Sequence, residues 1–258
     1  MQAPVTWWET FFTGVSVDLW LNAVPSSHTQ KEADLIAGTL ALAPEAEVLD
    51  VPCGHGRLAG PITERGYRVT GVDLSADALG HARRSSDSVA WEQRDMRDLP
   101  WPSRFDGAFC FGNSFGYMDD EGNAAFLRAV AHALKPGGRF LLECPVIAES
   151  WLPGYKDQLW AKVGDIYLLV ANQYDHVRGR LETEYTFVTG GRVEVRHGSQ
   201  RVYTYRQLAD LMEAAGFSDV SGQTWAREGR PESGVPARLT EPYYFRAPTL
   251  LVSATRPH

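Results

Sequence analysis

Apolar and polar positions follow two different periods along the chain, and the change of period divides it. Between residues 46 and 144, short apolar runs alternate with helical segments, and each run is bounded by Gly, Pro or Asp. The runs are AEVLDV, YRVTGVDL, VAWEQRD, FDGAFCFG and GRFLLECP. Because parallel strands need crossover connections, this alternation predicts an α/β fold with a doubly wound, mostly parallel sheet and helices on both faces. Further strands expected at residues 217–225 and 249–255 make the sheet seven-stranded.

Two segments have the apolar spacing of amphipathic helices. In DEGNAAFLRAVAHALKPGG, apolar residues recur four apart from Phe126 to Leu134, and we expect the helix to end at the Lys-Pro-Gly-Gly of residues 135–138. In TYRQLADLMEAAGF, Thr204 and Gln207 have the spacing of a capping box at a helix start.

From about residue 160 to 203 the apolar period changes to two. The runs DIYLLVANQYD, RLETEYTFVTG and RVEVRHGSQRVYT have short connections and predict three strands of an antiparallel meander. We expect residues 148–203 to form an inserted β cap in a single domain, whose core comprises residues 41–147 and 204–258. The insertion is expected to cap a pocket or to form a homodimer surface. Aromatic residues in and beside the insertion would either line that pocket or pack on a sheet face. They are Trp151, Trp160, Tyr167, Tyr174, Tyr185, Phe187, Tyr243, Tyr244 and Phe245.

Charge and composition narrow the class of partner. The net charge is -7 over 258 residues, which argues against a nucleic-acid partner because such binding depends on clustered Lys and Arg. Three cysteines without a CxxC pair fit neither a disulfide framework nor a zinc site, and no histidine pair has metal-ligand spacing. The N-terminus lacks the pattern of a secretion signal, and no apolar run is long enough for a membrane span. We therefore expect a soluble cytoplasmic protein that binds no membrane and no metal.

A glycine-rich loop directly follows the first predicted strand, in VLDVPCGHGRLAG. Gly54-x-Gly56-x-x-Ala59 matches the dinucleotide fingerprint, and Asp73 ends the next strand, so NAD is one candidate ligand. Asp50 points to another candidate, because an acid beside the loop would repel a pyrophosphate and favour a cation.

Five segments in order then carry a family resemblance: DVPCGHG, GVDLS, RDMRDLP, FDGAFCFGNSFGYM and LKPGGRFLLE. Together they resemble the class I S-adenosylmethionine-dependent methyltransferases, of the bacterial small-molecule type. The resemblance runs from Val48 to the helix ending at Gly216, and it implies a Rossmann-like fold with S-adenosylmethionine as cofactor and S-adenosylhomocysteine as product. One departure is Pro52, which stands where the family usually has its first glycine and has no N–H to donate.

The resemblance also implies roles for individual residues. Asp73 would bind the ribose hydroxyls and Leu74 would pack near the adenine, while Asp95 and the backbone of Met96 would contact the adenine amine and ring. Residues 1–40 would form a helical lid to which Trp7 or Trp8 contributes. The positions expected to bind the cofactor are Asp50, Cys53, Gly54, Gly56, Asp73, Leu74, Asp95, Met96, Phe111, Asn113 and Trp8.

The expected reaction is methyl transfer to an N, O or C atom of a small molecule by in-line displacement. Such a reaction needs orientation, exclusion of water and at most one base, for which the candidates are Asn113, Tyr117 and His176. Methylation of nucleic-acid bases is disfavoured, because GNSFGYM stands where those enzymes have Asn/Asp-Pro-Pro-Tyr/Phe. Two alternatives stay open: a non-catalytic S-adenosylmethionine-binding sensor or scaffold, and an NAD-dependent oxidoreductase.

Overall fold

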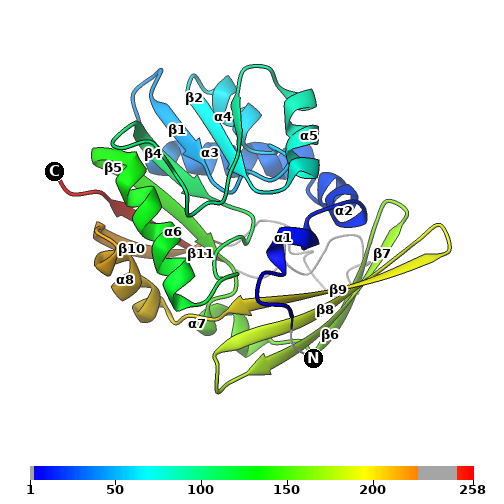
Figure 1. Cartoon of the computed structure of the whole chain (residues 1–258). Coiled ribbons are helices and arrows are strands. Elements are labelled where there is room, and N and C mark those ends of the chain that lie inside the picture. Colours follow the sequence, from blue (N-terminus) through cyan, green and yellow to red (C-terminus); the bar gives the residue numbers. More distant parts are fainter. Residues whose placement is uncertain (1–2, 226–248) are drawn as a thin grey trace, which may run out of the picture.

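The computed structural model describes residues 3–225 and 249–258, whose strands form two separate sheets (Figure 1). The larger is seven-stranded, in the order β10-β11-β5-β4-β1-β2-β3. Strands β1 to β5 pair in parallel, whereas β11 runs antiparallel to both β5 and β10. The expected mostly parallel seven-stranded sheet is thereby confirmed. Its strands are β1 (Glu47–Asp50), β2 (Arg68–Asp73), β3 (Ala90–Gln93), β4 (Phe105–Cys110), β5 (Leu134–Cys144), β10 (Ser218–Trp225) and β11 (Thr249–Thr255).

Helices cover both faces of this sheet because successive strand residues point to opposite sides. In β1, Val48 packs into the apolar cluster of α3 and α4, while Leu49 packs into the cluster of α6 and α8. Strands β4, β5 and β11 divide their side chains between the same two clusters. The helices are α3 (Ser26–Leu40), α4 (Ala59–Glu64), α5 (Ala76–Ser85), α6 (Asp120–Ala133) and α8 (Tyr205–Ala214).

The strand order reverses at β1, which lies between β2 and β4. The chain runs outward through β2 and β3, then returns to the other side of β1 to form β4 and β5. Open α/β sheets bind ligands at such a switch point, beyond the carboxyl ends of the strands. This topology brings the residues after β1, β2 and β4 to one edge of the sheet.

A four-stranded antiparallel sheet in the order β6-β7-β8-β9 forms the cap below that edge (Figure 1). Sequence reasoning missed β6, whose alternation lasts only six residues. Its Ala161 and Val163 are buried and its other residues are at least partly exposed. The cap elements are α7 (Ala148–Trp151), the 3-10 turn η1 (Leu152–Gly154), β6 (Gln158–Val163), β7 (Ile166–Asp175), β8 (Arg180–Thr189) and β9 (Arg192–Arg201).

The N-terminal helices take two different positions. Helices α1 (Trp8–Phe11) and α2 (Val15–Ala23) pack on the cap, where Phe11 and Leu19 share a cluster with Leu168 and Phe187. Helix α3 instead packs on the large sheet. Only the first two helices therefore lie between the sheet edge and the cap (Figure 1).

The predicted helix boundaries are correct at one site and wrong at another. The capping box of α8 is confirmed, since the Thr204 side chain accepts from the Gln207 N–H and the Gln207 side chain accepts from the Thr204 N–H. Helix α6 ends at Ala133, before the expected Lys-Pro-Gly-Gly, because Leu134 already pairs with Phe105 in the sheet. Among the described residues no helix is long and apolar enough to cross a membrane.

Candidate cofactor and acceptor site

A cleft opens between the carboxyl edge of the large sheet, helices α1 and α2, and the inner face of the cap. Its floor is the loop after β1, with Asp50, Cys53 and Gly54. The loops after β2 and β4 form its sides, and residues of β8 and β9 close it from the cap. The expected cofactor segments and the inserted sheet thus meet in one cavity.

Asp50 is a buried acid on the floor of the cleft. The residue is 3% exposed, and its Oδ2 has no hydrogen-bond partner among the described residues. Burial raises the pKa of this carboxyl well above its usual range, although the Arg57 guanidinium acts in the opposite direction. A buried carboxylate with an unpartnered oxygen suits a cationic ligand group.

Asp73 holds the glycine loop in place from the end of β2. Its Oδ2 accepts the Gly54 N–H and its Oδ1 accepts the Ser75 N–H, each across 2.8 Å. Burial raises the pKa of Asp73, and the backbone hydrogen bonds oppose that shift. Since each carboxylate oxygen has a second lone pair, Asp73 can still accept from a ligand hydroxyl.

The two glycines of the loop have different surroundings. Gly54 has φ +55°, and apart from its chain neighbours no described residue lies within 4 Å of the position a Cβ would take there. Gly56 has φ +80°, and its Cβ would lie 2.5 Å from the Trp91 ring. Gly56 does not line the cleft and is required instead for packing against Trp91.

Asp95 and Met96 line the cleft after β3. The Asp95 carboxylate forms a two-pronged ion pair with Arg97, at 2.9 Å to Nε and 2.6 Å to Nη2. Burial raises the pKa of Asp95, but the hydrogen bonds from Arg97 outweigh it and lower the pKa overall. Asp95 is therefore charged and held in one orientation at this end of the cleft.

Two residues of the glycine loop add basic groups to the cleft wall. Arg57 forms an ion pair with the buried Glu32 of α3 and also donates to Thr29, which ties the loop to that helix. His55 has its pKa lowered to about 4, chiefly by burial and further by the nearby Arg57 and His81. His55 is therefore neutral at physiological pH.

Asn113 and Tyr117 lie on the loop between β4 and α6, at the cap end of the cleft. Asn113 has φ +64°, and its Oδ1 accepts from Gln200 Nε2 across 2.8 Å. The Tyr117 ring contacts Trp7 edge-on with ring centroids 4.7 Å apart. Burial raises the pKa of Tyr117 far above its usual range, so its hydroxyl keeps its proton.

The structure brings together most of the predicted site residues. Of those expected at the cofactor, all but Gly56 line the cleft, and Trp7 and Trp8 both contribute to it. Of the catalytic candidates, His176 is separate from the others, because it is exposed in the turn between β7 and β8 and does not line the cleft.

The predicted aromatic residues of the cap have several different surroundings. Tyr185 lines the cleft, whereas Phe187 is buried against α1 and α2. Trp151 and Tyr174 belong to a small cluster beside α7. Trp160 and Tyr167 are exposed, and Tyr243, Tyr244 and Phe245 lie outside the described residues.

Sequence reasoning missed two groups of cleft residues. Glu143 at the end of β5 is fully buried and accepts the Gly112 N–H across 2.7 Å. The rule applied to Asp50 and Asp73, an acid at the carboxyl end of a strand, would have found it in LLECP. No local signal marks Ser199 and Gln200, which reach the cleft only through the fold of the cap.

Comparison with known proteins agrees with this geometry. Residues 48–138 match the family described as a methyltransferase domain. The chain is 34% identical over 129 residues to dTDP-3-amino-3,6-dideoxy-alpha-D-glucopyranose N,N-dimethyltransferase of Streptomyces fradiae, covering 49% of this chain and 50% of that protein. It is 35% identical over 115 residues to a ubiquinone biosynthesis O-methyltransferase of Xanthomonas campestris pv. campestris (strain B100), covering 42% of this chain and 46% of that protein.

Solved structures match over almost the whole chain. The CcbJ methyltransferase from Streptomyces caelestis superposes with a TM-score of 0.73 at 17% identity, covering 97% of this chain and 99% of that one. CalS10, an amino pentose methyltransferase from Micromonospora echinaspora solved with SAM bound, superposes with a TM-score of 0.67 at 20% identity. The match covers 95% of this chain and 97% of that one. The chain spans about half the length of the curated relatives it matches. The fold and the resemblance to S-adenosylmethionine-dependent methyltransferases are both confirmed.

Proposed function

We propose that this protein is an S-adenosylmethionine-dependent methyltransferase that methylates an N, O or C atom of a small molecule. The observation that carries the proposal is the Asp50 carboxylate, which is buried at the end of β1 beside the glycine loop. Its Oδ2 has no hydrogen-bond partner in the part of the chain that the structure describes. This acid disfavours an NAD pyrophosphate and suits the ammonium and sulfonium of S-adenosylmethionine. When bound, this cofactor supplies an electrophilic methyl group for in-line displacement.

The described residues give each part of that cofactor a suitable neighbour. Asp50 and Gly54 hold the methionine part, and the free lone pairs of Asp73 accept the ribose hydroxyls. The adenine end is bounded by Leu74, Met96 and the Asp95 carboxylate fixed by Arg97. These roles agree with the order of the segments that carry the family resemblance.

The cap end of the cleft receives the acceptor. Asn113, Tyr117 and Gln200 present neutral hydrogen-bonding groups there, and Trp7 and Tyr185 supply aromatic walls. Because Tyr117 keeps its proton, it orients the acceptor as a hydrogen-bond donor and does not remove a proton from it. Methyl transfer then depends on orientation and on exclusion of water by α1 and the cap.

Relatives with detectable identity support a small-molecule acceptor without fixing its atom. Two of them are named for N,N-dimethylation of dTDP-amino sugars, and others for O-methylation in ubiquinone biosynthesis or of fatty acids. The net charge of -7 further disfavours a nucleic-acid acceptor.

Calorimetric titration with S-adenosylmethionine, S-adenosylhomocysteine and NADH tests the cofactor. We expect the first two compounds to bind. Asp50→Asn should weaken their binding at least tenfold. Asp34→Asn is the control and should leave their binding unchanged, because Asp34 pairs with Arg65 on the surface. Binding of NADH alone would overturn the proposal. A panel of amino sugars, amines and phenols, assayed by S-adenosylhomocysteine release, then tests turnover; tight binding without any turnover would favour a sensor or scaffold.

The outer face of the cap is proposed as the surface of a homodimer. It exposes Trp160, Tyr167, Leu169, Val193 and Val195, each at least 44% exposed, on strands β6, β7 and β9. Thr186 and Val188 of β8 lie between the residues of β7 and those of β9. Contiguous apolar patches of this kind typically mark an interface. Sedimentation equilibrium should give a dimer that Leu169→Lys dissociates, and a monomeric wild-type protein would contradict the proposal.

The cysteines support a cytoplasmic location. Cys53, Cys110 and Cys144 are all buried and unpaired, as expected in a reducing compartment. Burial raises the pKa of each thiol, so none is activated as a nucleophile.

A further inference from the structure

The loop between β4 and α6 is attached to the cap through four consecutive carbonyls, those of residues 115–118. Each accepts a hydrogen bond from a cap residue: Phe115 from Gln200 Nε2 at 2.7 Å, Gly116 from the Arg201 N–H at 2.7 Å, Tyr117 from Arg180 Nη2 at 3.0 Å, and Met118 from Arg180 Nη1 at 2.9 Å. The cap therefore determines the path of the loop that carries Asn113 and Tyr117.

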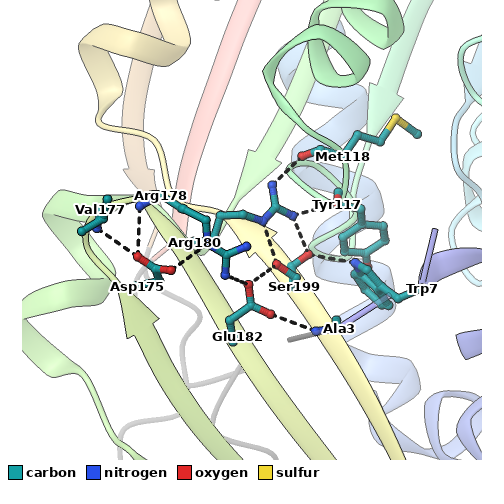
Figure 2. A network of polar contacts seen from close by, with 10 residues as sticks. All are labelled: Ala3, Trp7, Tyr117, Met118, Asp175, Val177, Arg178, Arg180, Glu182 and Ser199. Carbon is teal, nitrogen blue, oxygen red and sulfur yellow. Dashed lines mark hydrogen bonds and ion pairs between the residues drawn. The ribbon is translucent and has the colours of Figure 1, made fainter. Parts of the chain in front are cut away.

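Arg180 connects this loop to the N-terminal segment as well (Figure 2). Its Nε donates to Ser199 Oγ at 2.7 Å, and its Nη2 donates to the Ser199 carbonyl at 3.0 Å. The same carbonyl accepts the Trp7 indole N–H at 2.9 Å. One guanidinium thus binds both the Tyr117 carbonyl and Ser199, the β9 residue whose carbonyl holds the Trp7 indole. The rings of Trp7 and Tyr117 are in contact in the cleft.

Behind the cleft wall, Ser199 Oγ links Arg180 to the buried acid Glu182. Glu182 is 6% exposed, and its Oε1 accepts from Ser199 Oγ at 2.9 Å and from Arg178 Nη2 at 2.7 Å. Its Oε2 accepts the Ala3 N–H at 3.2 Å, at the start of the described chain (Figure 2). Neither Arg178 nor Arg180 lines the cleft.

We propose that Arg180 is a positioning residue that sets the acceptor wall of the cleft by holding the 115–118 loop and Trp7 in register with the cap. The inference rests on the proposed function in taking the cap end as the acceptor end. Only a planar guanidinium offers donors in a fixed fork that can reach three carbonyls and a hydroxyl at once. A Lys ammonium is a single nitrogen and cannot span these acceptors, so Arg180→Lys should fail as Arg180→Met does.

Amide hydrogen exchange measured by NMR tests the positioning without an acceptor. The Arg201 amide, which donates to the Gly116 carbonyl, reports directly on the attachment of the loop. We expect Arg180→Met and Arg180→Lys to speed its exchange on the order of tenfold, because hydrogen bonds from a charged donor are lost. The Val170 amide lies in the β6–β7 ladder and should be unaffected. Both amides should also be unaffected in the control Arg206→Met, which removes an exposed arginine that pairs with Asp210 on α8.

A second signature is the Trp7 resonance in the 19F spectrum of 5-fluorotryptophan-labelled protein, assigned with Trp7→Phe. It should shift in both Arg180 variants and remain in place in Arg206→Met. Ser199→Ala keeps the carbonyl that binds Trp7 but removes the Oγ partner of Arg180, so it should give a smaller shift of the Trp7 resonance. This variant replaces the Arg180 variants in the test if they do not fold.

Binding and turnover separate this inference from the proposed function. Calorimetric Kd values for S-adenosylhomocysteine should agree within about threefold between wild type and both Arg180 variants, while kcat/KM for an acceptor found in the panel should fall about 100-fold. Failure of S-adenosylhomocysteine to bind the wild type would reject the proposed function and leave the exchange result standing. Unchanged exchange of the Arg201 amide together with an unmoved Trp7 resonance would overturn the positioning role. Loss of protection at Val170 equal to that at Arg201 would also overturn it, because Arg180 would then only stabilise the cap.

Discussion

The Gly54 N–H donates a hydrogen bond to Asp73 Oδ2 across 2.8 Å, so the acid at the end of β2 shapes the loop that follows β1. Asp73 also lines the cleft, and it therefore has two roles that a single substitution would confuse. One role, seen in the structure, is to order the glycine loop. The other, proposed above, is to accept hydrogen bonds from the cofactor.

Two substitutions at Asp73 should separate these roles. Asp73→Asn keeps one carbonyl oxygen for the Gly54 or Ser75 N–H, whereas Asp73→Ala removes both acceptors. We expect the alanine variant to lose about 2 kcal/mol of unfolding free energy and the asparagine variant about half of that. Both should weaken S-adenosylhomocysteine binding at least tenfold. Urea denaturation and calorimetry provide the measurements. Wild-type stability of both variants would show that the loop does not depend on Asp73.

Asp50 should make cofactor binding depend on pH. Burial raises the pKa of Asp50, and only the charged carboxylate attracts a cationic ligand, so affinity should fall as the pH is lowered toward that raised pKa. In Asp50→Asn the affinity should be lower at pH 7.5 and should depend less on pH than in the wild type. Calorimetric Kd values for S-adenosylhomocysteine at pH 7.5, 6.5 and 5.5 provide the comparison; parallel profiles for the two proteins would exclude Asp50 as the titrating group.

His55 should lower the stability of the protein in mild acid. Burial lowers its pKa to about 4 in the folded state, whereas the unfolded chain takes up the proton near pH 6.5. The unfolded state thus binds more protons between these values, and the folded protein should lose at most about 3 kcal/mol as the pH falls through this window. His55→Gln should reduce the slope of unfolding free energy against pH, measured by urea titration. An unchanged slope would contradict the assignment.

Gly71 in β2 should tolerate no side chain. A Cβ there would lie 2.5 Å from the Trp91 ring and 3.1 Å from Cys53 Sγ, although the backbone itself would accept alanine. Gly71→Ala should therefore cost roughly 1–3 kcal/mol of unfolding free energy. Gly60→Ala in α4 is the matched control, because its Cβ would point into open space among the described residues. This variant should be neutral or slightly stabilising. Similar stabilities of the two variants in urea would disprove the predicted steric conflict.

The prediction of the large sheet succeeded because its strands and helices are specified by local patterns. Apolar runs bounded by glycines and acids mark β1 to β5, and the alternation of strands with helices leaves few topologies. Strand β6 has too short an alternation to stand out, and the end of α6 depends on sheet pairing between Leu134 and Phe105. Local sequence patterns therefore predict whether a segment is a helix or a strand better than they predict where it ends.

The sequence by itself determined that the acids after β1 and β2 share one edge, because parallel strands present their carboxyl ends together. It also determined that a glycine loop lies beside them. Only the tertiary structure decided that Gly56 packs on Trp91 while Gly54 stays open, and that the cap holds the 115–118 loop. The Trp7 indole and the Ser199 carbonyl are 192 residues apart in the chain, and no local periodicity can encode a hydrogen bond between them. Such contacts arise only when separately specified elements pack together, and they shape the cap end of the cleft.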